Sequence, residues 1–339
     1  MLLVSRFQFQ NAIKTKMNLA YIIKLRLHFL TSLVLYLSFF LNGTQSYGQK
    51  DTNKIPELNG HVFIPNTYIE SPFMNSTFDL GVGLGSTGQY KYPLFEVDDK
   101  PVYGLSGQLL FVSIGLEYQQ KIQDWAAVYI KYRLSARIGT NVGSILSEGF
   151  STINSFQIGW KIRILEREKY KFSTTFGISN YNGTFLSVSK FIDDVVNNKP
   201  FPSLVTNTPA LNGNLGFQFA YGISELFGFK LNYLNAVGES LERGETAYYF
   251  SFGTGVDLNF YQKHNVPLGF SLVYVLSSRP EQVFKESGLS NSFNLKFAYT
   301  GTPDFILGLQ TSYTLVPITE EQGNFSAMGV AFALTYYFN

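Results

Sequence analysis

The sequence contains no cysteine, only three histidines, and few charged residues at 15%. The absence of cysteine excludes disulfides, thiol nucleophiles and thiolate metal sites. It also excludes a lipid anchor on an N-terminal cysteine. A formal net charge of +2 is too small to favour nucleic acid as a partner. We therefore expect no metal, no cofactor and no nucleic-acid partner.

Long hydrophobic runs are also scarce, and the one continuous run covers residues 29–41, after Lys24 and Arg26. A basic segment, a short apolar run and small residues near Gly48 are typical of a secretory signal peptide. The run is shorter than the roughly 20 residues of a transmembrane helix, although an N-terminal anchor helix is the alternative. We expect residues 1–48 to be a signal peptide, with translation starting at Met1 or Met17.

What the sequence does contain is aromatic residues (17%), 30 glycines and long alternating segments. In residues 155–164 every second residue is apolar and the residues between them are polar or glycine. Segments of about ten alternating residues have the length with which a tilted strand crosses hydrocarbon. Twelve such segments follow residue 75, at residues 76–86, 107–119, 125–139, 153–164, 170–181, 212–223, 227–236, 247–260, 268–277, 292–300, 305–315 and 327–338.

The connections between these segments alternate in length, from short ones such as 224–226 to long ones such as 182–211. Short turns on one side and long loops on the other are typical of an outer-membrane barrel. We therefore predict an all-β fold, a transmembrane antiparallel up-and-down β-barrel of about twelve strands over residues 76–339. Residues 49–75 form either a periplasmic tail or a small plug. A soluble β-sandwich is disfavoured, because aromatic residues such as Tyr118, Tyr181 and Tyr336 recur near the segment ends, as in the girdles at membrane interfaces.

The last segment alternates Met328, Val330, Phe332, Leu334, Tyr336 and Phe338 with Gly329, Ala331, Ala333, Thr335 and Tyr337. It resembles the terminal strand of outer-membrane β-barrel proteins of Gram-negative bacteria, porin-like in pattern but of no specific family. The resemblance implies an outer-membrane location, contact with lipid and lipopolysaccharide, and recognition of Tyr336 and Phe338 by the barrel-assembly machinery. One departure is that Asn339 follows the terminal aromatic residue.

The other face of the segments is expected to point into the lumen and to form a basic wall. Cations in a narrow passage of low dielectric raise the local concentration of anions. The alternative is that they pair with Glu117 or with acidic residues of a plug. The expected basic wall consists of Lys131, Arg133, Arg137, Lys161, Arg163 and Lys171, and the expected lumen acids are Asp79, Glu117 and Asp257.

Residues 184–198 break the alternation. Phe185, Val188, Ile192 and Val195 recur there at helical spacing, which predicts an amphipathic helix in the longest external loop. We expect it to fold inward as a constriction. Its alternatives are a position at the membrane surface and a docking site for a partner.

No catalytic residue is expected. Within the mature chain His61 precedes the barrel and His264 lies in a short turn, so neither reaches the outer rim where a lipid hydrolase acts. The leading hypothesis is a narrow, porin-like channel for small hydrophilic solutes with a bias towards anions. A second hypothesis is a non-conducting barrel that serves as scaffold or accessory to an envelope protein partner in a secretion or surface complex. A rim lipid hydrolase is the third and least favoured.

Overall fold

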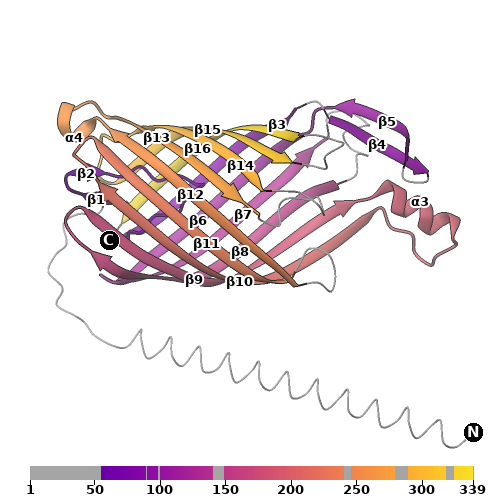
Figure 1. The fold of residues 1–339 in the computed structure, drawn as a ribbon, viewed down its shortest axis with the longest axis horizontal. Coiled ribbons are helices and arrows are strands. Elements are labelled where there is room, and N and C mark those ends of the chain that lie inside the picture. The colour runs from indigo at the N-terminus through magenta and orange to yellow at the C-terminus, as the bar shows by residue number, and fades with distance from the viewer. Residues whose placement is uncertain are drawn as a thin grey trace, which may run out of the picture. The chain divides into compact units, whose positions relative to one another are not determined.

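The structure, a computed structural model, describes residues 55–88, 90–97, 100–139, 149–239, 246–278, 289–317 and 324–338. The predicted signal peptide at residues 1–48 and the alternative start at Met17 lie outside these residues. Twelve antiparallel strands form one closed barrel, as predicted (Figure 1). The barrel strands are β3 (Ser76–Thr87), β6 (Leu110–Gln123), β7 (Ala126–Ile138), β8 (Gly149–Glu166), β9 (Tyr170–Leu186), β10 (Val205–Gly222), β11 (Phe227–Glu239), β12 (Thr246–Asn259), β13 (Leu268–Ser277), β14 (Ser290–Tyr299), β15 (Phe305–Pro317) and β16 (Asn324–Phe338).

The barrel closes between its last and first strands. β16 pairs with β3 from Phe338↔Ser76 to Ala327↔Thr87, so both strands are paired on both sides. Closure matters because a membrane contains no water to satisfy the backbone groups of a free strand edge. The short turns all lie at one end, and one of them holds the helix α4 (Tyr261–His264) between β12 and β13.

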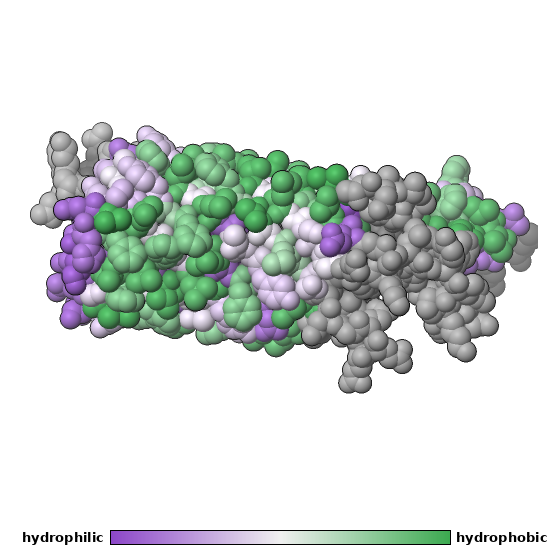
Figure 2. Space-filling view, turned by 90° about the horizontal axis from the view of Figure 1, so that it is seen from above, coloured by the Kyte–Doolittle hydropathy of each residue, from purple (hydrophilic) through white to green (hydrophobic). Residues whose placement is uncertain are grey.

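The outward face of the strands is apolar and exposed. Each of the twelve strands carries at least two exposed large apolar residues, among them Leu84, Ile158 and Phe332. Figure 2 shows these residues as a belt around the face in view, with hydrophilic residues gathered at the short-turn end. One predicted girdle residue is corrected, because Tyr181 lies on the inward face of β9 and is buried.

The connection between β3 and β6 contains a hairpin that the sequence pattern did not predict. Its strands are β4 (Tyr90–Val97) and β5 (Lys100–Gly107), which form a separate two-stranded sheet. Pro93 and Pro101 interrupt the alternation here, because proline removes a donor from the ladder. Two register shifts near Pro93 and Phe95 show the resulting irregularity.

The predicted helix exists, but with different bounds and in a different place. Helix α3 spans Val188–Val196, and the Ser187 hydroxyl caps it by accepting from the Lys190 amide at 3.2 Å. Phe185 belongs to β9 instead, because β9 and β10 continue well beyond their predicted ends. The helix lies at the tip of this long hairpin, near β4 and away from the lumen (Figure 1). It therefore does not form the expected constriction.

Among the described residues no helix is both long enough and apolar enough to cross a membrane.

Candidate functional site

Residues 55–75, hereafter the plug, occupy the lumen at the short-turn end of the barrel. The plug begins with the hairpin β1 (Glu57–Leu58) and β2 (His61–Val62) and ends where β3 starts. Phe63 and Ile64 are 2% and 0% exposed, although each belongs to a segment without regular structure. Their burial shows that the inner wall surrounds this part of the chain. Of the two alternatives for residues 49–75, the structure places the described part inside the barrel.

Lysine side chains of the wall bind the plug through its backbone. Lys230 donates to the Ile64 carbonyl at 2.7 Å, and Lys296 donates to the Pro65 carbonyl at 2.7 Å. Asp257 accepts from the Ile64 amide at 3.0 Å and pairs with Lys230 at 2.8 Å. Buried charges are costly unless they are paired and hydrogen-bonded. The seated plug therefore supplies acceptors that these two lysines need.

A second set of contacts centres on Glu70 of the plug. Its carboxylate accepts from Lys131 at 2.7 Å and from Gln218 at 3.2 Å. Lys131 also pairs with Glu117 at 3.3 Å. The sequence pattern left open whether Lys131 sets a field or pairs with Glu117 and a plug acid, and in the structure Lys131 has both acidic partners.

The remaining predicted wall residues fall into two groups. At the short-turn end Arg163 and Lys171 both contact Glu166, the latter at 2.8 Å. Lys161 is buried and donates to Gln119 at 2.6 Å. Nearer the long-loop end Arg133 and Arg137 face inward from β7. The predicted acids also face inward, with Asp79 bonded to Thr335, Glu117 to Lys131, and Asp257 to Lys230.

Small residues on the wall let the plug approach closely. A Cβ added at Gly222 would overlap the backbone of Leu58, and one added at Gly228 would overlap the His61 ring. At Gly269 an added Cβ would meet the Ile64 side chain. At these three positions the wall is therefore shaped to the plug, because glycine lets another part of the chain approach the strand closely.

His61 is a titratable plug residue that packs against the wall at this rim. It is 0% exposed, its Nδ1 lies 3.1 Å from the Glu225 carbonyl, and its ring meets Phe63 edge-on at 4.8 Å. Burial lowers the pKa of His61 below the ordinary value of 6.5, against opposing effects of Asp257 and of the Glu225 carbonyl. Its Nε2 has no hydrogen-bond partner among the described residues. The neutral ring is therefore the form that this site accepts.

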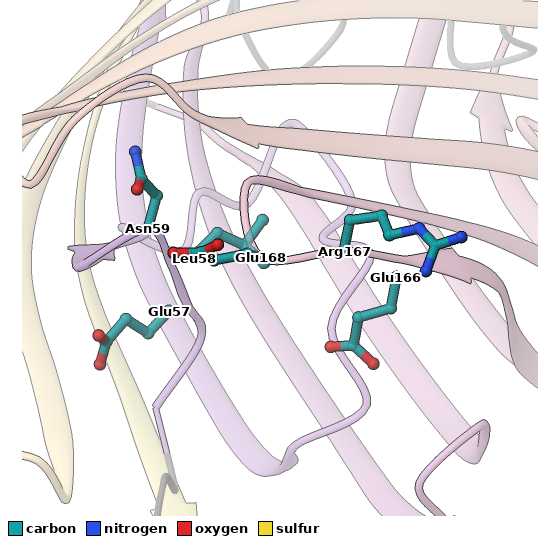
Figure 3. A pocket seen from close by; sticks show the side chains of 6 residues that line it. All are labelled: Glu57, Leu58, Asn59, Glu166, Arg167 and Glu168. Atoms are coloured by element: carbon teal, nitrogen blue, oxygen red, sulfur yellow. The ribbon is translucent and has the colours of Figure 1, made fainter.

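A small cleft remains where the hairpin β1–β2 meets the β8–β9 turn (Figure 3). The Asn59 amide donates to the Glu168 carbonyl at 3.0 Å across it. Figure 3 shows the carboxylates of Glu57 and Glu166 extending to one side and Asn59 to the other. Because these carboxylates do not point towards one another, the cleft is simply a gap between the plug and the β8–β9 turn. Its lining residues are Glu57, Leu58, Asn59, Glu166, Arg167 and Glu168.

An exposed apolar belt on every strand, a polar interior and a closed strand order define the architecture. The fold is that of a transmembrane β-barrel.

No family model and no curated protein matches the chain. Similar solved structures include the NanC porin, with 9% identity and a TM-score of 0.45 over 76% of this chain and 100% of that chain. The translocator domain of the autotransporter NalP from Neisseria meningitidis has 9% identity and a TM-score of 0.43, over 78% and 88%. The toluene transporter TodX of P. putida has 9% identity and a TM-score of 0.41, over 80% and 94%. At these values the likeness carries no argument about what the barrel does.

Sequence reasoning missed the plug side of the site. Thr67 and Glu70, which contact Arg133 and Lys131, lie in a segment without periodicity, so no pattern marked them. One available signal was the excess of lumen cations over lumen acids on the strands, which called for acceptors from elsewhere in the chain. A second was the number of inward glycines.

Proposed function

We propose that the protein is an outer-membrane channel for small hydrophilic solutes, closed at its periplasmic end by residues 55–75 and biased towards anions. The observation that carries this proposal is the exposure of inward-facing residues beyond the plug. Ser113 and Arg133 point into the barrel and are nevertheless exposed. In register with Arg133, an added Cβ at Gly115 would find no atom within 4 Å. The interior beyond the plug therefore has open space around these residues.

The contacts that hold the plug are suited to a part that moves. Several are hydrogen bonds from Lys, Asn and Gln side chains to plug carbonyls, and water can replace each of these once the segment leaves the wall. Solute passage then requires displacement of the plug. The bias towards anions follows from Arg133 and Arg137, which face the water-filled part of the interior.

A reversible lock tests this function. A Cβ added at Gly253 on β12 would lie 3.5 Å from Cγ1 of Ile69, the atom that the sulfur of a cysteine introduced there would replace. The double variant Ile69→Cys/Gly253→Cys is therefore close to disulfide geometry, and no native cysteine competes. In planar bilayers we expect the oxidised variant to be silent. After addition of a reductant it should conduct like the unmodified protein.

The matched control is Ser277→Cys/Ser290→Cys, which joins two neighbouring wall strands whose residues face each other in register. Its conductance should not change with oxidation, because it leaves the plug free to move. A barrel that stays silent in the reduced state would instead favour the non-conducting scaffold. A scaffold would also co-purify with an envelope protein in fixed proportion.

A further inference from the structure

Arg133 occupies a different environment from the other inward cations. It lies on β7 in register with Gly115 of β6, which in turn is in register with Gly81 of β3. The row across these three strands therefore contains one arginine beside two positions without side chains. Arg133 is exposed, whereas the side chains of Lys131 and Lys230 are 8% and 3% exposed. Arg133 is therefore accessible to solvent inside the barrel.

The partner of Arg133 is a neutral group of the plug. Its Nη2 donates to the Thr67 carbonyl at 3.0 Å. Lys131, by contrast, pairs with two carboxylates and Lys230 with one. A guanidinium has five donors and binds a carboxylate or phosphate through two parallel hydrogen bonds, which are stronger than a bond to a carbonyl. An oxyanion is therefore a better partner for Arg133 than the one it has.

The nearby acids do not take this role in the structure. Glu117 lies on the adjacent strand one inward position nearer the short-turn end, where it pairs with Lys131. Glu70 binds Lys131, and Asp79 is bonded to Thr335. These contacts direct the three carboxylates to other groups. The negative charges of these carboxylates also repel an anion that moves further towards the short-turn end, which keeps the binding position at Arg133.

The Thr67 carbonyl belongs to the outermost turn of the plug. The Thr67 hydroxyl accepts from Gln310 at 2.8 Å, and the neighbouring Asn66 donates to Asn294 at 3.1 Å. These are neutral hydrogen bonds, each worth only about 0.5–1.5 kcal/mol. The Arg133 contact is the charged one on residues 66–67, while Lys296 and Lys131 hold Pro65 and Glu70 on either side, so its loss loosens this turn first.

We propose that Arg133 is the binding site for a solute carboxylate or phosphate, and that binding there releases the Thr67 carbonyl and loosens the plug. This inference rests on the proposed channel function and adds to it the class of solute and the way in which the solute opens the passage. The barrel would then stay closed in the absence of its solute and open from the outside when the solute arrives.

The rate of disulfide formation in Ile69→Cys/Gly253→Cys reports plug seating in detergent, without any need for conductance. We expect inorganic phosphate or succinate, each against chloride at equal ionic strength, to slow this rate by about 5-fold or more. The added variant Arg133→Gln should abolish the response. Arg133→Lys should weaken it, because an ammonium lacks the planar fork. Arg163→Gln, which removes a cation at the other end of the lumen, should leave it intact.

Two results would overturn the inference. One is an unchanged rate with phosphate and with succinate, and the other is equal slowing in the Arg133→Gln background. A clear anion response in a protein that never conducts would retain the site and reject the channel. If the barrel conducts but neither anion changes the rate of disulfide formation, the channel function stands and the anion site at Arg133 is rejected.

Discussion

At the residue scale, glycine on the inner wall decides how closely the plug can approach. Gly228 faces His61 and Phe63, and an added Cβ would lie 2.7 Å from the Phe63 ring. We predict that Gly228→Val displaces the hairpin β1–β2, since overpacking costs about 1–3 kcal/mol. Cleavage after Phe63 or Tyr68 by a protease specific for aromatic residues should accelerate by about 10-fold, the factor that corresponds to 1.4 kcal/mol.

The control for this prediction is Gly213→Val on the lipid face of β10. An added Cβ there would meet only the Val237 carbonyl at 3.8 Å. Its cleavage rate should match that of the unmodified protein, with mass spectrometry assigning each cut. If the plug of Gly228→Val is cleaved no faster than that of the unmodified protein, the hairpin tolerates the larger side chain on the wall.

His61 adds a dependence on pH at the same rim. Because burial lowers the pKa of His61 below 6.5, the seated hairpin binds fewer protons than the displaced one. The stabilisation of the seated form is therefore complete above pH 6.5 and is lost as the pH falls through 6.5 towards the lowered pKa. Asp257 opposes the shift and Lys230 adds to it. Plug cleavage should be faster at about pH 5 than at about pH 8.

This dependence on pH should disappear in His61→Gln, which cannot gain a proton. His264→Gln is the matched control, because His264 is exposed on α4. If His61→Gln keeps the full dependence, another group governs plug seating.

At the element scale, barrel closure depends on the last strand. The Phe338 ring stacks on Tyr118 of β6 at 5.7 Å and on Tyr336 at 6.3 Å, so it joins β16 to strands beyond the seam. We predict that Phe338→Ala lowers the yield of folded barrel, measured as the fraction that migrates as the compact form in unheated electrophoresis. An aromatic pair contributes about 0.5–1.5 kcal/mol to stability in addition to the contribution of its buried apolar area.

Phe332→Ala is the comparison for this prediction, since Phe332 is lipid-exposed in the middle of the same strand. It removes an aromatic ring of equal size at a position in register with Val82 of β3, without removing the Phe338–Tyr118 stack. If Phe332→Ala lowers the fraction of folded barrel more than Phe338→Ala does, contact of the ring with lipid matters more for folding than stacking across the seam.

Strands were predictable from the sequence wherever one face contacts lipid and the other faces the polar interior. The segments 170–181 and 268–277 begin at the first residues of β9 and β13, because lipid on one side and polar groups on the other enforce strict alternation. This rule ends with the apolar belt. Beyond it the outward positions of β9 become polar, as at Asn180 and Asn182, so the continuing strand could not be distinguished from a loop. For the same reason Phe185 was assigned to a helix.

The candidate site was predictable on the barrel side only. Lys131 and Glu117 were placed on the inner face because strand periodicity dictates it, and they lie there in the structure. Their partner Glu70 could not be found, since an irregular segment has no period and its contacts depend on the shape of the closed lumen. Long-range pairing of this kind is a property of the assembled barrel.

At the scale of the whole molecule, the plug changes the charge of the interior when it moves. Seated, it gives Lys131 a second carboxylate and places carbonyls on Lys230 and Lys296. Displaced, it takes Glu70 with it, and the wall keeps more cations than acids. The open channel should therefore be more selective for anions than the contacts of the closed form indicate.

We predict that Lys131→Gln/Arg133→Gln/Arg137→Gln shifts the reversal potential of the open channel towards cations in a salt gradient. With these three cations gone, Glu117 and Asp79 dominate the water-filled part of the interior, and the permeability ratio should fall by about 10-fold. Arg163→Gln/Lys171→Gln removes two cations held by Glu166 at the turn end and should have a smaller effect. The shift should also shrink with salt, because the screening length falls from about 10 Å at 0.1 M to about 3 Å at 1 M. An unchanged reversal potential would assign Lys131 and Arg133 to holding the plug, which is the other role that their contacts with Glu70 and Thr67 allow.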